Sequence, residues 1–473
     1  MTRADPTANL PPARVQPDAR GRIRRALADA GRRIAVLDDD PTGSQTVHGV
    51  DVVTVFEPEE LAAGLSEAGS TCFVLTNTRS LPEADAVELN TRVGAMLFEL
   101  ADRLEAPIDL VSRSDSTLRG HVIAEVRALD AARRQGTGRG FDGVLLAPAY
   151  FEAGRFTVGD AHWARVGADV QPVSETEFAR DATFGYAASD LRDFVAEKSG
   201  GAIRPGEVAS ITLDDIRLGG AARVAELLAG VTGGRFVVVN AVEYADLEVV
   251  VLGLLDAEAA GRSFLCRTGP SFVQALAGLD QRDPLGASDI WADGRPRGHG
   301  LVVVGSHVGL TSRQVAVARD RGGLAEVELD VAAVADPARR DGHVAEATRR
   351  VLAALEGSDV LLVTSRDLRR GRDAAESLEI SRRVSTAVTE VVRGALPARP
   401  AWVVAKGGIT SHDVAVRGLG IRRAAVLGQL FPGLVSVFRP LDAAPEAVGI
   451  PYVVFAGNVG DETALASVID RLR

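Results

Sequence analysis

Acidic and hydroxyl residues crowd the end of one apolar run near the N-terminus. The segment IAVLDDDPTGSQT (residues 34–46) passes from four apolar residues directly into Asp38, Asp39 and Asp40, and then into Pro, Thr and Gly. Three carboxylates at the tip of a strand are costly if they are buried without partners. Facing a ligand, they can instead accept hydrogen bonds from its hydroxyl groups. The segment is therefore a candidate ligand site at the end of a strand, to be weighed together with the other loops that follow strands.

Three other apolar runs end in polar loops of similar composition. They are TNTRS (76–80), SRSDSTLRGH (112–121) and APAYFEAGRFT (147–157), and they add Arg79, Arg119 and Arg155. A guanidinium fork matches a carboxylate, and Asp side chains accept hydrogen bonds from sugar hydroxyls. Taken singly, each loop is better explained by helix capping and by Asp–Arg pairing. Four such loops in one stretch of chain favour a site for a small polyhydroxy acid.

Glycine-rich loops follow three apolar runs in the C-terminal part, within residues 301–318, 402–415 and 452–472. Each passes from a strand-like run through Gly to a helix-like run, with Thr311 or Ser312 as the expected cap in the first. Glycines let backbone N–H groups turn towards an anion, and helix N-termini favour negative charge. Each such contact contributes only about 0.3–1 kcal/mol, so a triphosphate needs several of them and a metal ion. Together the loops predict a phosphate cradle, with Lys406 directly before Gly407.

Strands must position these loops, and the sequence predicts twelve of them. Most are apolar throughout, as expected of parallel strands covered on both faces. Helical patterns such as SRRVSTAVTEVVRGAL (381–396) lie between many of them, which indicates α/β organisation. Ligands of open α/β sheets bind beyond the carboxyl ends of the strands, where the polar loops should gather. The predicted strands are residues 33–38, 71–76, 108–113, 143–149, 235–240, 301–306, 325–330, 359–365, 401–406, 424–429, 434–439 and 452–457.

The stretch DPLGASDIWADGRPRGHG (283–300) interrupts this alternation, and neither a strand nor a helix pattern fits it. We therefore predict two α/β domains with mostly parallel sheets around a central cleft. The expected division is a disordered tail with a short helix around 23–30 (1–32), a ligand-binding domain (33–282), a linker (283–298) and a phosphate-binding domain (299–473).

Composition excludes several classes of protein. The 473 residues carry a formal net charge of -11 without a dense basic cluster, which argues against nucleic-acid binding. No apolar run reaches the roughly 18 residues of a membrane span, and no secretory signal is present, so we expect a cytoplasmic protein. Cys72 and Cys266 form no disulfide or metal pattern, and no pair of histidines has zinc spacing. P-loop and protein-kinase motifs are absent.

Six segments in order resemble the four-carbon acid sugar kinases, which phosphorylate tetronates and their keto forms with ATP. They span residues 39–460, nearly the whole folded chain. The segments are DDPTG (39–43), SDSTLRG (114–120), GRFT (154–157), VSETEFARD (173–181), KGGITS (406–411) and GNVG (457–460). The resemblance implies that the N-terminal domain binds the sugar acid, that the C-terminal domain binds ATP, and that transfer occurs across the cleft. Mg²⁺ arrives with ATP, and no structural metal is expected.

The resemblance also implies roles for individual residues. Asp39 and Asp40 are the candidate catalytic residues, and we favour Asp40 as the proton acceptor. This chain departs from many relatives at GSHVG (305–309), where they have GSCS, and at Ile409, where they have Glu. The implied substrate-binding residues are Asp39, Asp40, Thr42, Gly43, Asp115, Ser116, Arg119 and Arg155, and the implied nucleotide-binding residues are Ser306, Gly407, Gly408, Ile409, Thr410 and Gly457.

The range of substrates in this family covers D-threonate, D-erythronate, 3-oxo-tetronates and the branched 3-oxo-isoapionate, and the sequence does not choose among them. A homodimer is expected as the commonest soluble assembly. Two other functions stay open. Asp38-x-Asp40-x-Thr42 fits the D-x-D-x-T of haloacid-dehalogenase-type phosphatases, whose acidic metal pair could only be Asp461 and Glu462. Two α/β lobes could also form a non-catalytic sugar-acid sensor.

Overall fold

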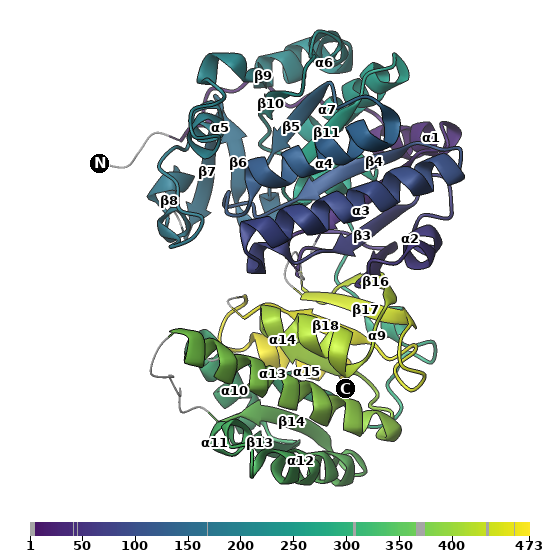
Figure 1. Cartoon of the computed structure of the whole chain (residues 1–473), viewed down its shortest axis with the longest axis vertical. Helices are drawn as coiled ribbons and strands as arrows, with labels where there is room; N and C mark the ends of the chain where they lie inside the picture. The colour runs from purple at the N-terminus through teal and green to yellow at the C-terminus, as the bar shows by residue number, and fades with distance from the viewer. Residues whose placement is uncertain are drawn as a thin grey trace. The chain divides into compact units, whose positions relative to one another are not determined.

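The computed structural model describes residues 5–40, 42–44, 46–167, 169–305, 309–365, 374–431, 435–457 and 459–473, with the backbone alone for 374–378. The chain forms two α/β units (Figure 1). The N-terminal unit comprises Met1–Val47 and Val55–Gln281, and the C-terminal unit comprises His48–Thr54 and Arg282–Arg473. The expected mixed α/β fold with mostly parallel sheets is confirmed.

A sheet of seven parallel strands organises the described part of the N-terminal unit. Most of its strands are continuous apolar runs buried on both faces, which is why the sequence predicts them. In spatial order the strands are β3 (Thr71–Leu75), β1 (Arg33–Asp38), β4 (Ile108–Arg113), β11 (Phe264–Thr268), β5 (Gly143–Ala147), β10 (Arg235–Val239) and β9 (Ala209–Ile211).

Several strands escape the sequence prediction, each for a local reason. Strand β11 contains Arg267 within an otherwise apolar run, and β9 has only three residues. A second, antiparallel sheet of β6 (Arg155–Val158), β7 (Ala161–Val166) and β8 (Asp169–Pro172) carries exposed and intermediate positions that resemble a loop in sequence. The small sheet begins at Arg155, one of the predicted site residues.

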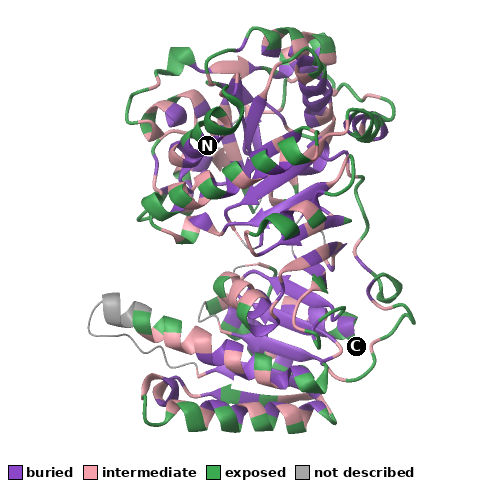
Figure 2. Ribbon diagram, turned by 45° about the vertical axis from the view of Figure 1, so that its right-hand side comes forward, coloured by how far each residue is buried: buried purple, intermediate pink, exposed green. Residues whose placement is uncertain are grey.

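Helices cover the strands of the N-terminal unit, and α3 and α4 lie in front of them in Figure 1. Gly94 of α3 permits their close approach, since a Cβ atom there would lie 3.1 Å from Ala132 and Leu129 of α4. Figure 2 shows buried strands and exposed outer faces of the helices. The helices are α1 (Ala19–Asp29), α2 (Pro58–Gly64), α3 (Glu83–Arg103), α4 (Val122–Thr137), α5 (Leu191–Lys198), α6 (Gly220–Ala229), α7 (Tyr244–Ala259) and α8 (Pro270–Leu276).

The sheet of the C-terminal unit is parallel in its first five strands and antiparallel in its last three. Strand β2, which follows the acidic loop in sequence, pairs with β16 and was not predicted. In spatial order the strands are β13 (Leu324–Leu329), β14 (Asp359–Thr364), β12 (Leu301–Val304), β15 (Val403–Lys406), β18 (Tyr452–Phe455), β17 (Val435–Asp442), β16 (Arg423–Gln429) and β2 (Val50–Val53).

The helices of this unit pack in pairs, α10 against α15 and α12 against α13. The stretch that follows Gln281 belongs to the C-terminal unit and contains a short helix, so the prediction that it has none is wrong. The Asp289 carboxylate accepts a hydrogen bond from Gly286 N at 2.8 Å and starts that helix. The helices are α9 (Ala287–Ile290), α10 (Gly309–Arg321), α11 (Val331–Ala335), α12 (Arg340–Leu355), α13 (Ala374–Ala395), α14 (Gly408–Asp413) and α15 (Ala464–Leu472).

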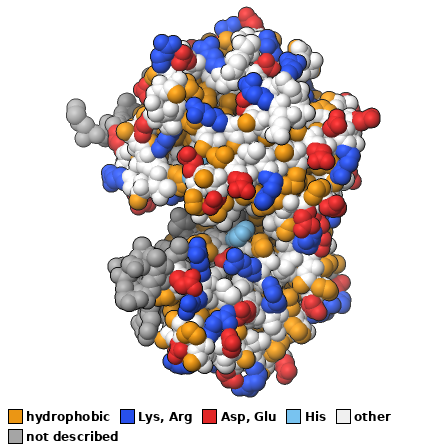
Figure 3. All heavy atoms as spheres, in the orientation of Figure 1, with side chains coloured by type: hydrophobic (Ala, Val, Ile, Leu, Met, Phe, Trp, Pro, Cys, Tyr) orange, Lys and Arg blue, Asp and Glu red, His pale blue; other side chains and the backbone are white. Residues whose placement is uncertain are grey.

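Part of the N-terminal tail is held in place. Arg217 Nη1 donates to Pro11 O at 2.6 Å, and Arg14 Nη1 donates to Leu218 O at 2.9 Å. The prediction of a disordered tail is therefore wrong for this segment, although the short helix after it is present as α1. Among the described residues, no helix is long and apolar enough to cross a membrane. The face in Figure 3 mixes acidic and basic side chains.

Candidate active site

Asp38 ends β1 and is fully buried. In the parallel register it lies beside Arg113 of β4, whose Nη1 donates to Asp38 Oδ1 at 3.1 Å. Burial raises the pKa of Asp38 to about 7, although the charge of Arg113 opposes that shift. A Cβ atom on Gly43 would overlap the Asp38 carboxylate, so the loop can close over this residue only with glycine at that position. Asp38 therefore has a structural role, because the loop that follows it packs against its carboxylate through Gly43.

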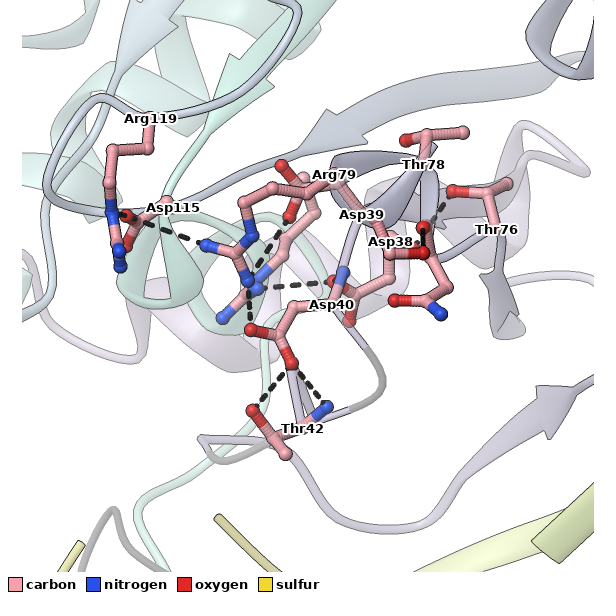
Figure 4. Close-up of polar contacts among 12 residues, drawn as sticks. Asp38, Asp39, Asp40, Thr42, Thr76, Thr78, Arg79, Asp115 and Arg119 are labelled. Atoms are coloured by element: carbon pink, nitrogen blue, oxygen red, sulfur yellow. Dashed lines mark hydrogen bonds and ion pairs between the residues drawn. The ribbon is translucent and has the colours of Figure 1, made fainter. Parts of the chain in front are cut away.

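Asp40 is committed to local contacts. Its Oδ1 accepts hydrogen bonds from Thr42 N at 2.8 Å and from Thr42 Oγ1 at 2.7 Å, which forms an Asx turn. Its Oδ2 pairs with Arg79, from the loop after β3 (Figure 4). Both oxygens of the Asp40 carboxylate thus have partners.

Arg79 is the cation that the acidic loops share. Besides Asp40, its guanidinium lies 3.4 Å from the Asp115 carboxylate and 3.9 Å from the Asp39 carboxylate. Asp115 also accepts from Arg119 Nε at 2.6 Å and from Thr117. Burial alone would raise the pKa of Asp115, but the charges of Arg79 and Arg119 and these hydrogen bonds hold it at about 2. Asp115 is therefore an ionised anchor for the two arginines.

Asp39 differs from its neighbours. It is 2% exposed, and neither carboxylate oxygen has a hydrogen-bond partner among the described residues. Burial raises the pKa of Asp39, against the lowering effect of Arg79. Gly120, with φ of 122°, leaves room beside it, because a Cβ atom there would lie 3.0 Å from Asp39 Oδ2 and 3.2 Å from Arg267 Nη2. A buried carboxylate without hydrogen bonds is the arrangement expected where a ligand completes the site.

Arg155 and Arg119 lie against one aromatic ring. Their guanidinium carbons are 5.6 Å and 5.1 Å from the centre of the Phe178 ring. Arg119 also approaches Asp181 at 3.7 Å, in addition to its bond with Asp115. Arg155 forms no ion pair with any described residue, and its buried Nε has no hydrogen-bond partner there. Of the two arginines, Arg155 is the one available to an anion.

A buried charged group that the sequence analysis missed lies close to Asp39, on the other side of Gly120. Arg267 of β11 is 1% exposed and donates from Nη1 to Ser112 Oγ at 2.6 Å and to Glu125. Glu125, on α4, also accepts from Thr78. The run FLCRT (264–268) was not among the predicted strands. Its charged residue within a short apolar run is the sequence feature that could have pointed to Arg267.

Ser116 is buried, and its carbonyl oxygen accepts a hydrogen bond from His162 Nε2 at 2.9 Å. The other ring nitrogen, Nδ1, accepts from Thr157 Oγ1 at 2.9 Å, so His162 holds the loop after β4 as a neutral ring. Burial lowers its pKa to about 4. His162 is thus a structural donor.

The three glycine loops of the C-terminal unit leave neighbouring strands. Val304, Lys406 and Phe455 lie side by side at the ends of β12, β15 and β18, so their loops emerge at one edge of the sheet. A Cβ atom on Gly305 would lie 2.6 Å from Thr410 Oγ1, which shows that two of the loops touch. Ser306 lies outside the described residues.

Gly407 has a φ of 117°, which favours glycine, while the Cβ position of Gly408 has no atom within 4 Å. Ile409 is 72% exposed. Among the described residues, no group of three or more His, Cys, Asp or Glu side chains could hold a metal ion. Asp461 accepts from Thr463, and Glu462 pairs with Arg313 at 2.6 Å, so both residues proposed for a phosphatase metal have other partners.

Two family models match the chain. Residues 34–276 match a sugar-binding N-terminal domain, and residues 301–465 match a nucleotide-binding C-terminal domain. The chain belongs to the four-carbon acid sugar kinase family. These matched ranges fall within the two structural units apart from the β2 segment, which the N-terminal match includes. No curated protein matches the sequence.

Solved structures share the fold of this acid sugar kinase family member. The Haemophilus influenzae protein HI1011, of the DUF1537 family, is 17% identical, covers 93% of this chain and 100% of its own, and has a TM-score of 0.63. A Salmonella typhimurium LT2 protein provisionally named a tRNA synthase is 18% identical, covers 92% of this chain and 98% of its own, and has a TM-score of 0.67.

In this member of the family, the residues that the sequence singled out fall into two groups. The first lies in the N-terminal domain, where Asp39, Asp40 and Asp115 lie around Arg79, and Arg119 and Arg155 lie against Phe178. Thr42 is bound to Asp40, Gly43 lies against Asp38, and the Ser116 carbonyl is bound to His162. The second lies at the edge formed by β12, β15 and β18 in the nucleotide-binding domain and contains Gly407, Gly408, Ile409, Thr410 and Gly457.

Proposed function

We propose that the chain is an ATP-dependent kinase that phosphorylates the terminal hydroxyl of a four-carbon or branched sugar acid, such as a tetronate or a 3-oxo-tetronate. The observation that carries this proposal is the Asp39 carboxylate, which is buried among arginines without a hydrogen bond from any described residue. An unpaired buried polar group costs about 1–3 kcal/mol. A substrate hydroxyl that donates to Asp39 would remove that cost, and it is the group that kinases of this family modify.

The acid end of the substrate would bind Arg155. The Arg155 guanidinium has no carboxylate partner among the described residues, whereas Arg119 is already paired with Asp115 and Asp181. Phe178 provides an apolar wall beside both guanidinium groups. This arrangement supports an anionic, hydroxylated substrate over a neutral sugar, because a neutral sugar would leave the Arg155 charge unpaired.

In the proposed reaction, the substrate oxygen attacks the γ-phosphorus of ATP, the bond from that phosphorus to the β–γ bridging oxygen breaks, and ADP leaves. The hydroxyl proton passes to a carboxylate. Asp39 fits this role better than Asp40, because its oxygens accept no hydrogen bond from a described residue and burial raises its pKa above the ordinary value. Arg79 would offset the charge that Asp39 and Asp40 bring to the site.

The glycine loops after β12, β15 and β18 would hold the phosphates. Close backbone approach suits Gly407, Gly408 and Gly457, and Gly408 has open space around its Cβ position. A Mg²⁺ ion that arrives with the nucleotide would supply positive charge near the transferring phosphoryl group.

A screen for ADP release tests the proposal. The purified chain, with ATP and Mg²⁺, is offered D-threonate, D-erythronate, 3-oxo-tetronates and 3-oxo-isoapionate, and the products are identified by ³¹P NMR. We expect ADP and a phosphomonoester only when an acid is present. Phosphate release from sugar phosphates without ATP would instead indicate a phosphatase. Binding of an acid without any ATP turnover would indicate a sensor.

The phosphatase alternative has less support. It would use Asp38 as its nucleophile, yet Asp38 is fully buried and bound to Arg113. We further expect a cytoplasmic enzyme that assembles as a homodimer. Light scattering of the purified chain, with a mass of 49.6 kDa per copy, tests the assembly.

A further inference from the structure

Lys406 ends β15, yet it points into the protein. It is fully buried, and its Nζ donates to Ala456 O at 2.6 Å and to Val459 O at 3.4 Å. The ammonium lies 3.6 Å from the centre of the Phe455 ring. It forms no ion pair with any described carboxylate. Both carbonyl groups belong to the segment that follows β18.

Two side chains of α10 bind the same segment. Thr311 Oγ1 donates to Gly457 O at 3.0 Å, so Thr311 does not serve as the helix cap that the sequence suggested. Gln314 Nε2 donates to Val459 O at 3.0 Å and to Asp461 O at 2.7 Å. Both side chains are fully buried. Together with Lys406, they bind carbonyl oxygens at four positions of the loop after β18, namely 456, 457, 459 and 461.

These contacts determine which way the loop amides face. In a trans peptide the C=O and N–H groups point in opposite directions, and the described chain contains no cis peptide. With the carbonyls of Ala456 and Val459 turned inward, the N–H groups of Gly457 and Gly460 point away from Lys406. Neither N–H binds another described residue. Two N–H groups of one loop that face outward in this way can both donate to the oxygens of a phosphate.

We propose that Lys406, Thr311 and Gln314 are positioning residues that fix the loop after β18 in its phosphate-binding form, and that Lys406 does not itself contact the phosphates. This inference rests on the proposed nucleotide site of the C-terminal unit. It runs against the simplest expectation for a lysine beside a pair of glycines, which is direct pairing with a phosphate.

The other lysine of the chain shows the same chemistry. Lys198 Nζ donates to Phe184 O at 3.1 Å and to Gly185 O at 2.6 Å in the N-terminal unit. Only these two of the 53 Lys and Arg residues are lysines. A compact ammonium can direct its three donors to separate carbonyls, whereas a planar guanidinium is larger and has a fixed fork. Lysine therefore suits both positions.

Binding of Mg·ATP to the full chain, measured by calorimetry, tests the proposal. Thr311→Val keeps the shape but removes the donor, and we expect about tenfold weaker binding, with Thr311→Ser close to the wild type. Lys406→Met and Lys406→Arg should both weaken binding by tenfold or more, since neither reproduces the ammonium between the carbonyls. Lys198→Met is the matched control and should leave ATP affinity unchanged.

The results separate the alternatives. Lys406→Arg with wild-type affinity, beside a defective Lys406→Met, would show that the charge acts on the phosphates and would overturn the proposal. Equal affinities of Thr311→Val and the wild type would also overturn it. If the Lys406 variants do not fold, the two Thr311 variants decide. A wild-type chain that does not bind ATP would overturn the proposed function first, and this inference with it.

Discussion

Asp39→Asn should remove most of the turnover, whereas Asp40→Asn should mainly weaken binding of the acid. The two residues are adjacent but differently engaged. Both oxygens of Asp40 have partners, in Thr42 and Arg79, while neither oxygen of Asp39 accepts a hydrogen bond from a described residue. A carboxylate that accepts no hydrogen bond within the described part of the protein is free to accept the proton of the substrate hydroxyl.

The expected sizes follow from these contacts. A general base contributes about 10²–10⁴-fold, and a loose phosphoryl transition state places the loss at the lower end, so kcat should fall about 10²-fold in Asp39→Asn. In Asp40→Asn the amide oxygen can still accept from Thr42, but the charge opposite Arg79 is lost. A charged hydrogen bond is worth about 1.5–3 kcal/mol, so KM for the acid should rise roughly ten- to a hundredfold.

The pH profile adds an independent test of Asp39. Burial raises the folded-state pKa of this carboxyl above the ordinary value of 3.8. The base is lost as pH falls through that raised pKa, so the acidic limb of kcat/KM should lie above the range of an ordinary Asp. Asp39→Asn should lack this limb.

ADP release, coupled to NADH oxidation and run with the acid found in the screen, measures all of these quantities. A larger fall in kcat for Asp40→Asn than for Asp39→Asn would reverse the assignment. Near-normal kcat in both variants would show that the acidic loop is structural.

Three further outcomes are expected. Arg155→Met should raise KM for the acid roughly ten- to a hundredfold and leave KM for ATP unchanged; a larger effect of Arg119→Met would place the carboxylate at Arg119. Gly408→Val should keep the melting temperature, because no atom lies within 4 Å of its Cβ position, but should weaken ATP binding in calorimetry at least about tenfold; unchanged affinity would contradict close phosphate approach. The folded-state pKa of His162 is about 4, below the ordinary 6.5, so the unfolded chain binds a proton that the folded chain does not, and stability should fall as pH drops from 6.5 towards 4, by up to about 3 kcal/mol. Urea unfolding of His162→Gln at pH 7 and pH 5 should show a smaller fall, and an equal one would count against this account.

Local pattern was enough to predict much of the fold. All twelve runs singled out in the sequence contain a strand. Most are apolar along their whole length because the strands are covered on both faces, whereas β13 and β16 have partly exposed positions. The same rule explains the failures. Strand β11 carries the buried Arg267, whose charge is tolerated through its bond with Glu125, and no local pattern reveals that partner. Strand β2 pairs with β16, more than 350 residues later, so its place depends on a distant segment.

The candidate site, like the fold, was predicted from the sequence only in part. Sequence alone identified the loop residues, since runs of Asp, Thr, Arg and Gly directly after apolar strands are unusual and match one family. Only the tertiary structure distinguished Asp39 from Asp40, and Arg155 from Arg119, because the difference lies in which partners each side chain has. It also turned Lys406 inward, to carbonyls about 50 residues later in the chain. Residue type and local spacing determine what chemistry a side chain offers, but long-range packing determines whether that chemistry is already used within the protein or left for a ligand.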